Sequence, residues 1–395
     1  MSADPGHDLG RFHLAYWGFF AYLGATGPFL TVFFKEDLHL GPEDSGALMA
    51  LLTSTTIVGG LLAARMADAW RARHLLRRVM SLAAALLCLA WFVVGPDDFA
   101  LAAVVIALQG LCIGPQIPFL DAATVDALGR DDRRYGSIRI WGTISWGCTA
   151  IIVGAARQWL SVARLIPMIM VAALALFHYS SWRIPDAQAA SATTRPRLDL
   201  RAARRSAPLM ALLAACFLHG VTFGNYEYFS ALTFEELGAT KLEVSMILVV
   251  GIVCEALVFA FSSKLLARFG PRRLCLAATL VTGVRWLLMP IVSTIPELVA
   301  LQTTHAFTFA LWYAPALHLT SRLVEPEVRT SGQSLLFLSL AAGSATGAFV
   351  GGNMRGEFGM TPAFLGAAVI NGLAALVLLA AWRTFDDATP VGARR

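Results

Sequence analysis

Charged residues are scarce in this sequence. Asp, Glu, Lys and Arg make up 14% of its 395 residues, whereas 57% of the residues are hydrophobic. A soluble domain of this length needs more charge to cover its surface, so the composition argues against a soluble enzyme or binding module. Apolar stretches of about 20 residues recur from end to end, and they match a hydrocarbon core about 30 Å thick. We therefore predict an all-α membrane protein with many spans.

Motifs of catalysis and metal binding are missing as well. The sequence has no HExxH, GxSxG, phosphate-binding loop or dinucleotide fingerprint, and its six cysteines form no CxxC pair. We therefore expect no enzyme, no catalytic residues and no metal site. The net charge of +5 lies in particular loops and does not indicate a nucleic-acid partner. A receptor or sensor is disfavoured because the tails are too short for a signalling domain.

Hydropathy predicts twelve transmembrane helices. They are expected near residues 12–34, 45–66, 75–94, 99–121, 137–156, 163–182, 208–231, 243–265, 274–292, 297–320, 331–352 and 362–382. The connections after even-numbered spans are basic, and most of the others are short and acidic, with Arg157 and Arg164 as exceptions. Because basic loops stay in the cytoplasm, both termini are expected on the cytoplasmic side of the cell (inner) membrane.

The spans fall into two similar halves. Residues 1–182 are predicted to form one six-helix bundle, 183–207 a basic cytoplasmic linker, and 208–395 a second bundle. Placing Ala267 over Asp68 aligns the loops after helices 2 and 8 at an offset of 199 residues. Duplicated six-helix halves are typical of transporters whose binding site lies between the halves near the midplane.

Two segments carry a resemblance to a known family. The loop after helix 2 matches the pattern G-x-L-x-D-R-x-G-R-R at Asp68 and Arg73 but departs from it at Ala64 and Ala69. Residues 135–142 read Y-G-S-I-R-I-W-G, a segment that opens helix 5 in one group of proton symporters. The chain thus resembles the major facilitator superfamily, in the branch of the lactose and phenylpropionate permeases. The resemblance implies two six-helix pseudo-repeats, proton-coupled import of a small solute without a cofactor, and a cytoplasmic gate at Asp68 and Arg73.

Three ionisable residues stand inside apolar spans of the second half. Glu255 and Arg285 both lie roughly 17 Å deep in consecutive helices, and His305 lies roughly 12 Å deep in the next. A buried carboxylate is costly, so Glu255 is expected to face a partner or a water-filled cavity, or to be protonated. Its depth makes Arg285 a candidate partner, and the three groups are expected to form a cluster. One reading is a fixed ion pair that only ties helices together. The other is a proton-coupling site, in which either Glu255 or His305 carries the proton.

The first half offers a different pair, Asp121 at the end of helix 4 and Arg139 at the start of helix 5. In the lactose permease an acid and an arginine at matching places bind sugar hydroxyls, so the resemblance implies this role for Asp121 and Arg139. The alternative interpretation is that Asp121 and Arg139 only anchor their helices at the cytoplasmic edge of the membrane. Laying Gly332 over Gly136 puts Leu335 at the place of Arg139, so the repeat does not require this charge. Polar and aromatic residues of neighbouring spans are expected to wall a cavity: Tyr22, Gln116, Asn225 and Trp312.

The substrate stays open among sugars, nucleosides, aromatic carboxylates and siderophores. The predicted function is proton-coupled symport by alternating access, with the proton gradient as the energy source. The protein is expected to be a monomer in the lipid bilayer. The alternative is a proton-driven antiporter that exports drugs or sugars, because a fold does not fix the direction of transport. Pro28, Pro115, Pro118 and Pro315 are expected to kink spans around the cavity.

Overall fold

The computed structural model describes residues 9–128, 134–160, 164–184, 199–385 and 389–392. In this part of the chain the regular structure is helical, apart from one isolated β-bridge between Val324 and Val391. The chain forms two compact units: unit 1 contains Met1–Ala192 with Thr240–Met246, and unit 2 contains Thr193–Ala239 with Ile247–Arg395. Most of the predicted linker, residues 185–198, lies outside the described residues, so the domain boundaries stay a prediction.

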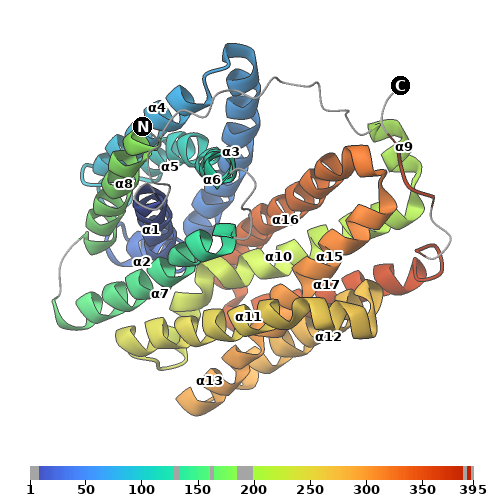
Figure 1. Cartoon of the computed structure of the whole chain (residues 1–395). Coiled ribbons are helices and arrows are strands. Elements are labelled where there is room, and N and C mark those ends of the chain that lie inside the picture. The colour runs from blue at the N-terminus through green and yellow to red at the C-terminus, as the bar shows by residue number, and fades with distance from the viewer. Residues whose placement is uncertain (1–8, 129–133, 161–163, 185–198, 386–388, 393–395) are drawn as a thin grey trace. The chain divides into compact units, whose positions relative to one another are not determined.

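Unit 1 is a bundle of helices in which α1 packs against α7 and α8, and α3 packs against α5 (Figure 1). Its helices are α1 (Gly10–Thr26), α2 (Leu30–Glu36), α3 (Pro42–Trp70), α4 (Arg73–Ala90), α5 (Phe99–Ile113), α6 (Gln116–Leu128), α7 (Tyr135–Trp159) and α8 (Leu165–Arg183). Small residues allow the close approach. A Cβ on Gly24 of α1 would come within 2.6 Å of the Trp146 carbonyl oxygen on α7, so this contact excludes a larger side chain.

Unit 2 is built around α10, which packs against α16 and α17 (Figure 1). Its helices are α9 (Leu200–Arg205), α10 (Ala207–Glu236), α11 (Lys241–Phe269, of which the first residues group with unit 1), α12 (Pro271–Leu288), η2 (Met289–Ile291), α13 (Ile295–Thr303), α14 (His305–Thr308), α15 (Ala310–Leu323), η3 (Pro326–Val328), α16 (Arg329–Phe358) and α17 (Met360–Ala380). Gly343, Gly347 and Gly351 face α10, and a Cβ on any of them would overlap atoms of that helix. The four-residue spacing thus serves close helix packing.

The helices have the length and composition of membrane spans. Within the described residues, nine helices or helix pairs are long and apolar enough to cross a bilayer, and ten if α1 and α2 form one bent span. Two predicted spans do not meet this test. The first is α4, whose first turns carry Arg73, Arg77 and Arg78, and the second is divided into α13, α14 and α15. The many-span architecture holds, whereas the number twelve is not settled by these helices alone.

The breaks in the spans only partly follow the prolines. Residues 27–29, which include Pro28, separate α1 from α2 at a bend of 45°, and Pro115 stands between α5 and α6. Pro315, in contrast, lies inside α15, and the span that contains it breaks earlier, at Thr304 and Phe309. This span therefore has two breaks that no proline marks.

The two arginines that depart from the loop-charge rule have local partners. Arg157 at the end of α7 bonds to Glu36 at the end of α2, with 2.9 Å between Nη2 and Oε1. Arg164 donates to the carbonyl oxygens of Trp91 and Val94, and its backbone N–H donates to Asp37 at 2.8 Å. These arginines tie the helix ends of unit 1 together, which explains why they stand among acidic connections.

Candidate functional site

The polar centre of unit 2 contains the three charges predicted from the sequence. His305 lies between the other two: its Nε2 is 3.4 Å from a carboxylate oxygen of Glu255, and its Nδ1 is 2.9 Å from Nη1 of Arg285. The three residues thus form one cluster, and within the described residues Glu255 pairs with His305 and makes no direct ion pair with Arg285, its candidate partner by depth. Depth along a helix gives the height of a side chain but not the direction in which it points.

The hydrogen bonds assign the tautomer of His305. An arginine guanidinium can only donate, so Nδ1 of His305 must accept from Arg285. The ring proton of the neutral imidazole is then on Nε2, where it points to the carboxylate of Glu255. A second proton on Nδ1 would face the Arg285 guanidinium and remove this bond. The arrangement therefore holds His305 neutral and makes Glu255 the acceptor.

Arg285 is almost fully buried, with 1% of its surface exposed, and its hydrogen-bond partners are uncharged. It donates to Gln302 Oε1 at 2.7 Å and to Thr308 Oγ1 at 3.4 Å. Its guanidinium carbon lies 4.4 Å from the ring centroid of Tyr226, whose hydroxyl also donates to Gln302. Buried charges need such compensation in a low-dielectric interior, and aromatic faces provide part of it.

Two further residues belong to this cluster, although sequence reasoning did not place them there. Gln302 of α13 accepts from both Arg285 and Tyr226. Glu227, next to Tyr226 on α10, interacts electrostatically with Glu255 and Arg285. Glu227 is also a charged residue inside an apolar span, so its position in the sequence could have indicated that it belongs to this cluster. Gln302 carries no such signal, because an uncharged amide near a helix end is ordinary.

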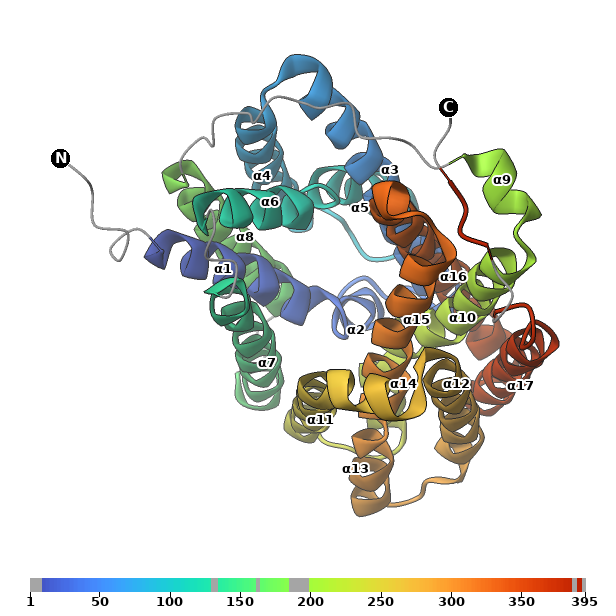
Figure 2. The ribbon, with the colours of Figure 1, turned by 45° about the vertical axis from the view of Figure 1, so that its right-hand side comes forward.

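The broken span that follows α12 brings these groups to α11. The labels of α13, α14 and α15 follow one another in Figure 2. The short helix α14 begins at His305, and the break at Thr304 separates this residue from Gln302 on α13. On α11, one turn before Glu255, Gly251 packs against both: a Cβ there would overlap Nε2 of Gln302 and lie 3.3 Å from the His305 ring. Gly251 thus lets α11 pack directly against the Gln302 and His305 side chains.

The polar centre of unit 1 contains Asp121 and Arg139, with Tyr16 of α1 between them. The Tyr16 hydroxyl donates to Asp121 at 2.5 Å and lies 3.4 Å from the Thr124 hydroxyl. The guanidinium carbon of Arg139 lies 5.4 Å from the Tyr16 ring centroid and 4.1 Å from that of Phe20. No ion pair joins Asp121 to Arg139 in the described part of unit 1. Both residues are half-buried.

The residues predicted to wall a cavity are buried in their own units. Tyr22 accepts from Gln109 Nε2 at 2.9 Å, and Gln109 in turn accepts from the Trp91 indole. Gln116 donates to the Cys112 carbonyl oxygen at 2.8 Å. In unit 2, Asn225 contacts Gly351 of α16.

Trp312 is fixed more firmly than the other three. It stacks on His219 with 4.8 Å between ring centroids and donates from Nε1 to Thr279 at 3.1 Å. Buried polar side chains with such partners are held in place. Contact of any of these four residues with a solute stays a prediction.

The predicted gate residues stand on either side of the turn between α3 and α4. Asp68 and Arg73 are both exposed, and the described structure records no hydrogen bond or ion pair between them. Arg71 makes the turn with a left-handed backbone, φ +50°. The buried contact of this region is instead Arg77, which donates to the carbonyl oxygens of Ser181 and Ile184 at the end of α8.

Comparison with known proteins agrees with this architecture. Residues 9–366 match the model of the MFS_1 like family. The chain is 27% identical to a maltose permease of Geobacillus stearothermophilus over 93% of its length and 94% of the relative. It is also 27% identical to a probable 3-phenylpropionic acid transporter of Escherichia coli (strain K12), over 77% of its length and 80% of the relative.

Solved structures show the same fold. The crystal structure of the nucleoside transporter NupG matches with a TM-score of 0.82 at 16% identity, covering 96% of this chain and 99% of that one. A bacterial homologue of the human lysosomal transporter Spinster matches with a TM-score of 0.75 at 14% identity, covering 98% and 99%. The chain belongs to the MFS_1 like family of the major facilitator superfamily, and it is a multi-pass membrane transporter of a small molecule rather than an enzyme.

Proposed function

We propose that this chain imports a small polar organic solute together with protons, by alternating access of its two halves. The observation that carries this proposal is the hydrogen-bonded series from Glu255 through His305 to Arg285 in unit 2. A carboxylate inside an apolar helix, bonded to a neutral imidazole, can gain and lose a proton as its surroundings change. A fixed structural bridge would be better served by a direct carboxylate–arginine pair.

We propose that Glu255 rather than His305 carries the transported proton. Protonation of His305 would direct a second N–H at Arg285, whereas protonation of Glu255 removes one negative charge and leaves both bonds of the imidazole possible. A movement of α11 away from α14 would separate Glu255 from His305 and break the contact between the carboxylate and the imidazole. His305 then positions Glu255 and transmits the charge of Arg285.

The solute is proposed to bind at Asp121 and Arg139. A carboxylate and a guanidinium that are not paired with each other can hold two polar groups of one solute, and the rings of Tyr16 and Phe20 give its apolar face a surface. Sugars and aromatic carboxylates are the first classes to test, because the two relatives are named for maltose and 3-phenylpropionic acid. Tyr22 and Gln116 of unit 1 would support this site, Asn225 and Trp312 of unit 2 are further proposed solute contacts, and Asp68 with Arg73 would form the cytoplasmic gate.

We further propose that the chain crosses the cell (inner) membrane twelve times and that both termini lie on the cytoplasmic side. Adding α4 and the divided helix α13–α15 to the ten candidate spans gives this number. The arginines of α4 do not prevent a span, because long basic side chains near a helix end can reach the interface. The basic connections after even-numbered spans then all face the cytoplasm.

The test is uptake into proteoliposomes under an imposed pH gradient. Maltose, 3-phenylpropionate and uridine are offered to vesicles with an alkaline lumen, and the expected result is accumulation of one of them above its outside concentration. Dissipating the gradient with a protonophore should abolish accumulation. Solute movement opposite to the direction of proton flow would indicate efflux antiport instead of symport. Uptake that does not depend on the pH gradient would overturn proton coupling.

A further inference from the structure

We propose that His219 on α10 is a second proton-binding residue of unit 2, placed to pass a proton between the polar centre at Glu255 and the cytoplasm. His219 is 1% exposed, and neither of its ring nitrogens makes a regular hydrogen bond to a described residue. An imidazole always carries at least one N–H, so two unpaired buried nitrogens call for an explanation. The relay role rests on the transport proposed above, whereas proton binding by His219 does not.

The first oxygen acceptor beside the ring is the side chain of Asn371 on α17. Its amide nitrogen donates to the Thr222 hydroxyl at 2.8 Å, and this hydroxyl donates in turn to the His219 carbonyl oxygen at 2.9 Å. The two bonds fix the orientation of the amide, because a hydroxyl that already donates must accept from Asn371. The amide oxygen Oδ1 is therefore left for the His219 ring, and it has no other hydrogen-bond partner in the described part of unit 2.

The second acceptor is the backbone of Thr308 on α14. In a continuous helix the Thr308 carbonyl oxygen would accept from the N–H of Trp312, four residues further on. The helix breaks at Phe309, and the Trp312 N–H donates to the Phe309 carbonyl oxygen at 3.1 Å instead. The break thus leaves the Thr308 carbonyl available to the His219 ring.

These surroundings differ from those of His305 in the property that decides protonation. A second ring proton on His305 would face the Arg285 guanidinium, which can only donate. A second ring proton on His219 has an oxygen to which it can donate, because Asn371 and Thr308 offer one acceptor for each nitrogen. The proton binds the free lone pair of the ring, and the imidazolium gains an N–H donor without losing a hydrogen bond.

The face of the His219 ring is also suited to a cation. Trp312 stacks on it, with 6° between the planes and 4.8 Å between the centroids, and Thr279 holds the indole by a hydrogen bond of 3.1 Å. An aromatic face attracts a cation, most strongly where water is excluded. Burial opposes the charge, so the ring is neutral at rest and holds the proton only briefly. A relay residue needs this balance, because it must release the proton that it receives.

His219 lies next to the polar centre of unit 2, on its cytoplasmic side in the orientation proposed above. Thr308 contacts both places: its Oγ1 is 3.4 Å from His305 Nδ1, and its backbone is a contact of His219. Trp312 comes later in the same span, which runs from α13 through α15 toward the cytoplasm. A proton that leaves Glu255 for the cytoplasm therefore has His219 on that side.

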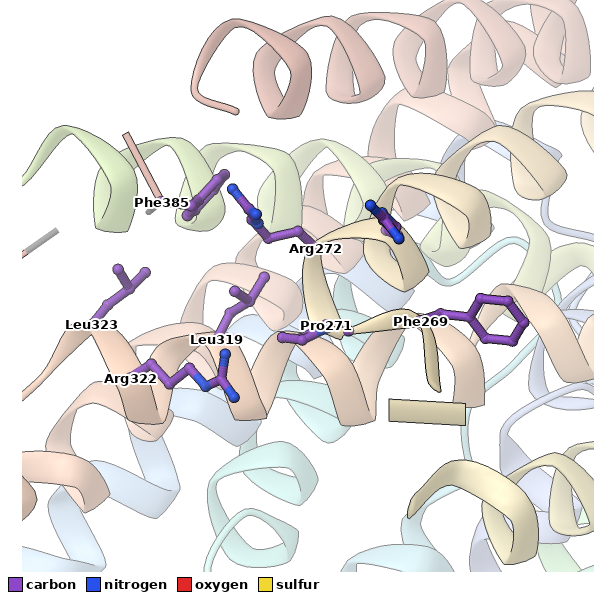
Figure 3. Close-up of a pocket in the computed structure, with 9 residues that line it drawn as sticks. Phe269, Pro271, Arg272, Leu319, Arg322, Leu323 and Phe385 are labelled. Carbon is purple, nitrogen blue, oxygen red and sulfur yellow. The ribbon is translucent and has the colours of Figure 1, made fainter. Parts of the chain in front are cut away.

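The His219 site is closed to solutes, which leaves the proton as its ligand. Thr308, Trp312 and Asn371 are all buried. The cavity of about 410 Å³ in unit 2 lies where α12 begins, and none of these residues lines it (Figure 3). A proton can reach a closed place through hydrogen-bonded groups, whereas an organic solute cannot.

Few titratable groups stand on the helix turns around His219. The helix α17 carries none and α16 carries none between Arg329 and Arg355, so the groups are Cys216 and Glu227 on α10, Cys275 and Arg285 on α12, His305 on α14 and Tyr313 on α15. Both thiols bond to carbonyl oxygens, and Glu227 interacts with Arg285 in the polar centre. His219 is thus the imidazole of this region that no arginine holds neutral.

The test uses Trp312 as a reporter, because a protonated imidazole quenches the fluorescence of a stacked indole more strongly than the neutral ring does. The purified full-length protein is titrated across roughly pH 4–8, and subtracting the Trp312→Phe variant isolates the contribution of this indole. We expect this contribution to fall as the pH is lowered. His219→Gln cannot take the proton and should lose the pH-dependence, whereas His318→Gln, which replaces an exposed histidine of α15, should keep it.

Asn371→Leu supplies a second variant. It removes one acceptor of the imidazolium and should move the transition in Trp312 fluorescence to lower pH, a shift that a merely structural role of Asn371 would not produce. A Trp312 contribution that does not change with pH in the wild type would overturn the proposal without any variant. A pH-dependence that persists in His219→Gln would overturn it as well.

The relay role is tested separately in proteoliposomes. His219→Gln should slow uptake driven by a pH gradient, while solute exchange at equal pH on both sides continues. Driven uptake at the wild-type rate would overturn the relay. The fluorescence titration needs no transported solute, so its result stands if the proposed symport fails, and a failed titration leaves the proposed role of Glu255 intact.

Discussion

Unit 1 and unit 2 contain the same ion pair at related helix ends. In unit 1, Glu36 at the end of α2 binds Arg157 at the end of α7, and in unit 2, Glu236 at the end of α10 binds Arg355 at the end of α16. The arginine side chains are 5% and 3% exposed and the glutamates 40% and 39%. Both residues recur after about 200 positions. The repeat has thus preserved a contact that joins two helices of each bundle.

The charges at the centres of the units are not repeated. At the offset of 199 residues, Glu255 corresponds to Thr56 and Arg285 to Leu86. When Gly332 is laid over Gly136, an offset of 196, Leu335 stands where the first half has Arg139. Each bundle therefore packs without the other's buried charges. Packing needs the helix pattern and the glycines, so the unshared charges are the ones that call for a functional explanation. In our proposal unit 2 handles the proton and unit 1 the solute.

The largest expected effect is that of Glu255→Gln. The amide keeps the size of the side chain but cannot carry a proton, so accumulation should fall to the outside concentration while downhill exchange continues. Proteoliposome uptake with and without a pH gradient measures both. Glu357→Gln, an exposed carboxylate at the end of α16, is the control and should accumulate normally. Full accumulation by Glu255→Gln would show that Glu255 does not carry the transported proton.

Arg139→Ala should alter affinity and leave coupling unchanged. Hydrogen bonds to charged groups contribute roughly 1.5–3 kcal/mol, so the KM of uptake should rise on the order of 10- to 100-fold. The ratio of protons to solute should stay that of the wild type. Arg134→Ala, an exposed arginine at the N-cap of the same helix, serves as the control. An unchanged KM would return Arg139 to the role of an interfacial anchor.

Gly347→Leu should destabilise unit 2 without touching either polar centre. The added side chain overlaps the Val221 carbonyl oxygen on α10, and overpacking of this kind costs about 1–3 kcal/mol. A lowered Tm of the purified protein is the expected result. Gly372→Leu, where a Cβ on α17 meets open space, should leave the Tm nearly unchanged. Equal Tm values for the two variants would contradict the close approach of α16 to α10.

The smallest effects should come from Glu36→Gln and Glu236→Gln. The glutamates are partly exposed and screened by water, so each change should cost roughly 1 kcal/mol, although the arginine left behind is buried. If the two bridges are equivalent, the two Tm decreases should be similar and the double variant should be additive. A large decrease for one and none for the other would show that the repeat preserves the contact but not its role.

Much of the architecture follows from the sequence, because hydrophobic length and loop charge act locally. The apolar stretches predict membrane helices wherever they exceed about 20 residues, and the comparisons confirm the superfamily. Glu255, Arg285 and His305 could be selected because a charge in an apolar span is conspicuous in any sequence. The sequence marked Tyr16 only as one polar aromatic residue among several, and it gave no indication that Gln302 belongs to a polar centre.

Partner choice depends on the tertiary structure. The rise of 1.5 Å per residue places Glu255 and Arg285 at one depth, but the rotation of each helix decides which side chains meet. His305 lies between the unpredicted breaks at Thr304 and Phe309 and contacts both charges, and Gly251 of α11 packs directly against Gln302 and His305. The sequence by itself determined that charges are buried in each half. Only the packing of the helices decided that an imidazole separates carboxylate from guanidinium in unit 2, and that a tyrosine stands between them in unit 1.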